Sequence, residues 1–93
     1  MEVIEISNTR GGGRYKEDVL VDLVKKALKE SKNGKIAGYP LQPFIKAVYD
    51  GEKPNMGALR KKIQEIGFKH NIGNIGVTIR EKKGEIGFYL KER

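Results

Sequence analysis

The chain has 93 residues, no cysteine and a formal net charge of +7 at pH 7, with 38% hydrophobic and 33% charged residues. This length suits one domain with a modest core, and the lack of cysteine excludes disulfides, thiolate catalysis and zinc–thiolate sites. No apolar run approaches the roughly 20 residues that cross a bilayer, and no stretch has the pattern of a signal peptide, so a cytoplasmic protein is expected.

The positive charge is concentrated in one part of the chain. Residues 1–31 contain six basic and six acidic residues, whereas residues 32–93 contain thirteen basic and six acidic ones, so the whole excess of seven follows residue 31. Such clustering is typical of proteins that bind a polyanion. The abundance of Lys, Glu and Ile also resembles the composition of thermophile proteins, in which a basic surface can serve solubility alone.

The first sixteen residues are expected to form a strand and a basic arm. Met1–Ile6 suits a short strand, which would either cap the sheet of its own chain or pair across a two-fold axis. The segment 7–16 contains three successive glycines, so we expect a flexible arm or a plain linker. In the arm reading, Arg10 and Arg14 contact nucleic acid and Tyr15 stacks on a base. A phosphate-binding loop is rejected, because no Gly-Lys-Ser/Thr follows the glycines.

The next three elements are a helix, a short strand and a second helix. Apolar residues at helical spacing predict a helix over Glu17–Ser31, which Asn33-Gly34 would end. A minor strand is expected over Lys35–Tyr39 and a shorter helix over Leu41–Asp50.

A third helix is predicted over Asn55–Ile66. Asn55 is a good N-cap, and the apolar stripe of the helix is Met56, Leu59, Ile63 and Ile66. Gly67 suits the left-handed position after the helix, with Phe68 as the hydrophobic contact that accompanies such an end.

The C-terminal segment predicts a β-hairpin. Two alternating runs, around 75–80 and 86–91, flank the turn Glu81–Gly84, and each has one apolar face. Tyr89 would face away from the core. Five other aromatic residues are expected to lie in the core: Tyr39, Phe44, Tyr49, Phe68 and Phe88.

This order of elements resembles the winged helix–turn–helix family, including its small archaeal and viral members. The resemblance covers residues 17–93 and depends on element order and spacing rather than on a sequence signature. It implies an α+β fold of three helices and a C-terminal hairpin wing, preceded here by the strand and arm of residues 1–16. It also implies that helix 55–66 enters the major groove of DNA and that wing 80–84 contacts the backbone or the minor groove.

The candidate nucleic-acid-binding residues follow from that assignment. On or beside the third helix they are Asn55, Gly57, Arg60, Lys61, Gln64 and Lys69; on the wing they are Arg80, Lys82 and Lys83. Arg, Lys and Gln are the usual donors to phosphates and base edges. Glu65 fits this surface least well, unless it pairs with Lys61 or accepts from a cytosine amino group, and Glu81 and Glu85 also interrupt it.

The sequence therefore predicts a small DNA-binding regulator or DNA-associated accessory factor that binds double-stranded DNA, as a monomer or a homodimer. No activated nucleophile and no metal-ligand spacing is present, so neither an enzyme nor a cofactor is expected, and no small-molecule substrate or membrane is inferred. Two alternatives remain: a winged-helix adaptor for protein assembly, and an RNA or single-strand binder that uses the glycine-rich arm.

Overall fold

The computed structural model describes residues 2–4, 6, 15–31, 35–49 and 54–91. In chain order its elements are β1 (Glu2–Val3), α1 (Glu17–Glu30), β2 (Ala37–Pro40), α2 (Leu41–Val48), α3 (Met56–Lys69), β3 (Ile75–Arg80) and β4 (Glu85–Leu90). The fold is α+β, as the sequence predicts.

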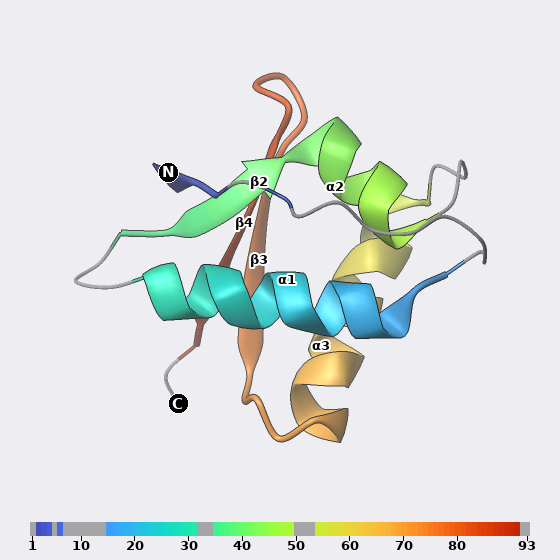
Figure 1. The fold of residues 1–93 in the computed structure, drawn as a ribbon, viewed down its shortest axis with the longest axis vertical. Helices are drawn as coiled ribbons and strands as arrows, with labels where there is room; N and C mark the ends of the chain where they lie inside the picture. Colours follow the sequence, from blue (N-terminus) through green and yellow to red (C-terminus); the bar gives the residue numbers. More distant parts are fainter. Residues whose placement is uncertain (1, 5, 7–14, 32–34, 50–53, 92–93) are drawn as a thin grey trace.

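The four strands form one mixed sheet in the order β1-β2-β4-β3. β1 runs parallel to β2, and β4 pairs antiparallel with both β2 and β3. Figure 1 shows α1 lying across one face of the sheet, with α3 beside β3 and the 81–84 turn projecting beyond the sheet. The N-terminal strand thus caps the sheet of its own chain, which is one of the two arrangements left open by the sequence.

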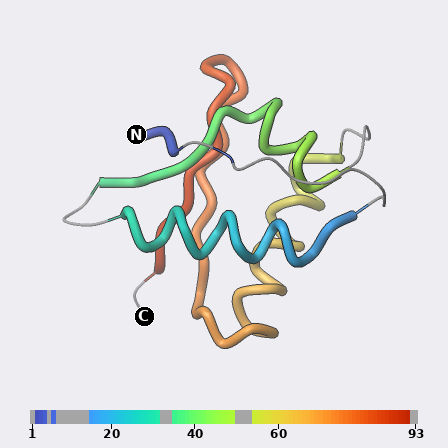
Figure 2. Tube along the Cα trace, viewed as in Figure 1, coloured from blue at the N-terminus to red at the C-terminus, as the bar shows by residue number. Residues whose placement is uncertain are grey.

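The trace in Figure 2 shows that β1 lies at the sheet edge away from α3, and that α1 crosses between these two parts of the molecule. Leu20, Val24 and Ala27 on α1 are fully buried. Their spacing of four and three residues places them on one face of the helix, as the sequence predicts.

An aromatic cluster lies at the centre of the core. Tyr39 of β2, Phe44 of α2 and Phe88 of β4 are fully buried, with ring centroids between 5.5 and 6.2 Å apart. The Tyr39 hydroxyl donates a hydrogen bond to the carbonyl of Leu23. Because its polar atom is satisfied in this way, the ring can be buried without a large desolvation penalty. The predicted core positions of these three aromatic residues are confirmed.

The end of α3 differs from the prediction. The helix continues through Gly67 to Lys69, and it is Asn71, with φ 56°, that adopts the left-handed conformation. The amides of Asn71 and Ile72 donate to the carbonyls of Phe68 and Gly67 and so close a Schellman motif. Gly67 has another role: a Cβ there would lie 2.5 Å from the carbonyl oxygen of Gly73, so the glycine permits close packing.

This longer helix changes the environment of Phe68. The sequence placed the phenyl group against the helix end and in the core, but the side chain is 64% exposed. Both expectations for Phe68 are therefore wrong. After the helix it is Ile72 that packs against the core.

The C-terminal hairpin has the predicted turn. β3 ends at Arg80 and β4 begins at Glu85, so the turn is residues 81–84. The side chain of Tyr89 lies over Gly76 on the outer face of the sheet, where a Cβ would meet the tyrosine ring at 2.3 Å. Tyr89 faces away from the core, as expected.

Candidate nucleic-acid interface

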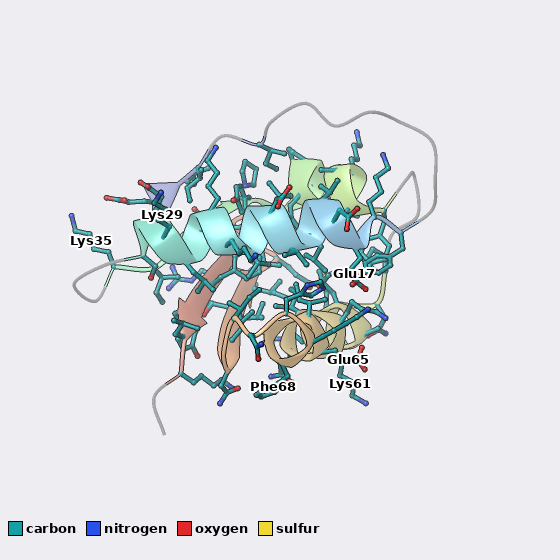
Figure 3. All side chains as sticks on the ribbon, turned by 60° about the horizontal axis from the view of Figure 1, so that its bottom comes forward. Glu17, Lys29, Lys35, Lys61, Glu65 and Phe68 are labelled. Atoms are coloured by element: carbon teal, nitrogen blue, oxygen red, sulfur yellow. The ribbon has the colours of Figure 1, made fainter. Side chains whose placement is uncertain are left out.

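The outer face of α3 carries the predicted polar residues. Leu59, Ile63 and Ile66 attach the helix to the core, and each is at most 1% exposed. At about 100° per residue, Lys61 then lies opposite this buried stripe. Figure 3 shows Lys61 and Phe68 on the side of α3 that faces away from α1.

Asn55 caps this helix. Its Oδ1 accepts hydrogen bonds from the amides of Gly57, at 2.8 Å, and Ala58, at 3.4 Å. The prediction of an N-cap is confirmed. Because the oxygen is occupied, only the amide NH₂ group of Asn55 remains to donate to a ligand. Gly57 is exposed beside the cap, so a ligand can approach the first turn closely.

Arg60 connects α3 to the hairpin. Its Nη1 donates a hydrogen bond of 2.7 Å to the carbonyl oxygen of Val77 on β3. This contact orients the guanidinium along the hairpin, and its other N–H groups stay available as donors.

A groove of about 540 Å³ separates the first turns of α3 from the end of the hairpin. Four of its lining residues are cationic and one is acidic. The full lining is Met56, Arg60, Ile79, Arg80, Glu81, Lys82 and Lys83. The fold therefore brings four of the predicted residues, which lie up to 23 positions apart in the sequence, into one basic groove. The apolar contribution of Met56 and Ile79 was not anticipated.

The tip of this hairpin is tied to the rest of the protein. Gly84 has φ +65°, a conformation that glycine adopts without strain. Its carbonyl accepts a hydrogen bond of 2.7 Å from the amide of Leu41, the first residue of α2. The basic turn therefore has a defined position relative to the helices.

Lys69 lies at the opposite end of α3 from the groove. Its Nζ is 2.9 Å from Oε2 of Glu17, and Nε2 of His70 is 3.0 Å from the same oxygen. These contacts lower the pKa of the Glu17 carboxyl, the hydrogen bond from Lys69 having the largest effect. Lys69 thus holds α3 against the start of α1, a role that the sequence does not reveal because the partner is 52 residues away.

We expect Glu17→Gln to lower the stability of the protein near pH 7 but not in acid. A carboxyl whose pKa is depressed in the folded state stabilises that state above its ordinary pKa of 4.5, and the contribution is lost as the pH falls through the lower folded value. The urea midpoint of unfolding at about pH 7 and about pH 3 measures the difference. Asp18→Asn, an exposed neighbour in the same helical turn, controls for the helix dipole. Equal losses in the two variants at both pH values would contradict a specific role for Glu17.

Glu65 pairs with Lys62 at 3.6 Å rather than with Lys61, the partner considered from the sequence. The Lys62 ammonium also lies 5.2 Å from the centre of the Tyr15 ring. Tyr15 packs in turn on Tyr49, with ring centroids 5.3 Å apart, and burial raises the pKa of its hydroxyl. In this position Tyr15 is a packing residue and does not present a free ring to a base.

Several predicted features remain apart from the groove. Arg10 and Arg14, within residues 7–14 of the glycine-rich arm, lie outside the described residues. Lys61 and Gln64 belong to the outer face of α3. Among the described residues, no group of three or more His, Cys, Asp or Glu side chains is placed to hold a metal ion, and no helix is long and apolar enough to cross a membrane.

No protein-family model, no curated protein and no solved structure matches this chain.

Proposed function

We propose that this chain is a winged helix–turn–helix protein that binds duplex DNA, with α3 in the major groove and the 81–84 turn against the sugar–phosphate backbone. The observation that carries the proposal is the basic groove, in which Arg60 of α3 meets Arg80, Lys82 and Lys83 of the hairpin. The order of helices and strands, with β4 between β2 and β3, supports the fold assignment.

The side chains of the 81–84 turn suit the phosphates of a duplex, and those of α3 suit its base edges. Lys and Arg on an exposed turn bind phosphates, which position a protein without reading sequence. Lys61 and Gln64 on the outer face of α3 offer donors and acceptors for base edges in the major groove. A helix with its polar face free and a basic loop at its N-terminal end is therefore suited to duplex DNA, and a small regulator or accessory factor is the role that fits best.

Each copy of the chain has one α3 to place in a major groove, so the number of grooves occupied depends on whether the protein binds as a monomer or a dimer. A two-fold dimer would place two copies of α3 in successive major grooves about one helical turn apart, as dimeric members of this class do. A monomer would cover a single half-site. The stoichiometry of the complex with a duplex longer than 20 base pairs, about two turns of DNA, distinguishes these arrangements.

The test is a salt titration of binding to three ligands of one sequence: duplex DNA, single-stranded DNA and single-stranded RNA. If the four cations of the groove each neutralise one phosphate, the slope of log K against log salt for duplex is about −3 to −4. We expect the duplex to bind most tightly. Absence of duplex binding at low salt, or tighter binding of either single strand, would overturn the proposal.

A further inference from the structure

Phe68 is the most exposed of the large hydrophobic residues in the described part of the chain, at 64%, ahead of Val3 and Leu90 at 53% and 52%. It lies inside α3, where the backbone is held by the helix and by the Schellman motif that follows. A phenyl group has a large apolar surface whose transfer from water is favourable. Because α3 holds the exposed Phe68 ring in a fixed position, the ring is suited to a ligand that has an apolar group facing it.

The neighbours of Phe68 on the helix surface indicate what kind of ligand this is. Residues 57, 61, 64 and 68 follow one another at spacings of four and three, so they form one strip on the outer face of α3. The strip presents an open backbone at Gly57, a cation at Lys61, an amide at Gln64 and the phenyl group. Glu65 lies on the adjoining side, where its carboxylate pairs with Lys62 at 3.6 Å. Figure 3 shows Lys61 and Phe68 of this strip, and Glu65 beside it, pointing away from the core.

We infer that Phe68 contacts the 5-methyl group of thymine, and that the protein therefore prefers sites that contain A·T pairs at this position. The inference rests on the proposed binding of duplex DNA. The thymine methyl is the one apolar group on the base edges of the major groove, and Phe is among the side chains suited to it. Gln64, one turn earlier, has the donor and acceptor that match the N6 and N7 atoms of adenine.

Charge complementarity favours a nucleic acid over a second copy of this chain on the strip. Lys61 lies seven residues, or about two turns, before Phe68, and the basic groove begins at Arg60 on the same helix. Two such surfaces facing each other would bring cations together, whereas a duplex offers phosphates to the cations and a methyl group to the ring.

The test compares two duplexes of about 20 base pairs with alternating A and T, in one of which deoxyuridine replaces every thymidine and so removes only the methyl groups. We expect the wild-type protein to bind the thymidine duplex about fourfold more tightly for each methyl group buried. Phe68→Ala should bind the two duplexes equally, whereas Phe68→Leu, which keeps an apolar side chain, should retain a preference. Binding is measured by fluorescence anisotropy well below the melting temperature of both duplexes.

Leu90→Ala is the matched control, because it removes a similarly exposed apolar side chain from β4 and should leave the preference for thymidine unchanged. A preference that persists in Phe68→Ala would overturn the role of the phenyl group and leave duplex binding intact. Failure of the wild-type protein to bind either duplex would overturn both proposals. If sedimentation shows that the wild-type protein is a dimer and Phe68→Ala a monomer, the ring belongs to an interface between copies and the inference is wrong.

Discussion

Replacing Arg80, Lys82 and Lys83 together by alanine is expected to weaken binding to duplex DNA by about two to three orders of magnitude at about 0.1 M salt. Each lost phosphate contact lowers the magnitude of the slope of log K against log salt by about 0.9, and at about 0.1 M, one decade below 1 M, three lost contacts lower log K by between two and three. All three residues line the groove beside α3. They are exposed, so the stability of the folded protein should change little. Anisotropy titrations at several salt concentrations measure both the affinity and the slope.

The control removes three charges elsewhere. Lys25 and Lys29 are exposed on α1, and Lys35 is paired at 3.8 Å with Glu2. In Figure 3 Lys29 and Lys35 lie on the far side of the molecule from Lys61. Their replacement by alanine changes the net charge by the same amount, so an equal loss of affinity in the two triple variants would show that binding follows overall charge and not the groove.

The second large effect concerns stability. Phe88→Ala is expected to lower the free energy of unfolding by about 3–5 kcal/mol, because it removes a fully buried ring and leaves a cavity. The ring contacts Tyr39 and Phe44, and β4 is one of the two inner strands of the sheet, paired with β2 and β3. A loss of this size is a large fraction of the stability of a small domain, and urea denaturation measures it.

Phe68→Ala supplies the comparison, since the same atoms are removed from a side chain that is 64% exposed. Its free energy of unfolding should stay within about 0.5 kcal/mol of the wild type. Similar losses at the two positions would mean that Phe68 is buried in solution. The same measurement shows whether Phe68→Ala is folded, and therefore whether a change in its DNA binding can be attributed to the missing ring.

Local patterns were sufficient to predict most elements of the fold. The helical periodicity around Leu20, Leu23 and Val24 predicted α1, and strict alternation around the Glu81–Gly84 turn predicted the hairpin. These signals depend on neighbouring residues only, because each element buries one face. The N-cap at Asn55 belongs to the same class, since its hydrogen bonds join residues two and three positions apart.

The end of α3 could not be predicted in this way. Glycine is the residue type that commonly ends a helix, so the local sequence predicts an end at Gly67. In the structure, the missing Cβ of Gly67 instead makes room for the carbonyl oxygen of Gly73. Because the helix extends by three residues, Phe68 moves from an expected core position to the surface. A glycine can either end a helix in the left-handed conformation or allow close packing within it. Tertiary packing determines which of the two occurs here, and the neighbouring residues in the sequence do not indicate it.

The sequence predicted which charged residues belong to the candidate site, but it did not predict their hydrogen-bond and ion-pair partners. The pattern identified Arg60, Arg80, Lys82 and Lys83, and the fold places all four around one groove. The bond from Arg60 to the Val77 carbonyl and the attachment of Lys69 to Glu17 join residues 17 and 52 positions apart. Such long-range partners depend on the packing of α3 against β3 and α1, which residue spacing along one helix does not determine.

The sheet order has a consequence for how the chain reaches its native state during synthesis. β4 is the last of the described strands to leave the ribosome, yet it occupies the middle of the sheet between β2 and β3. Until it emerges, β2 has only the two-residue strand β1 beside it, and Tyr39 and Phe44 lack the ring of Phe88. The aromatic cluster and the pairing that joins β2 to β3 can therefore be completed only after residues 85–90 are released.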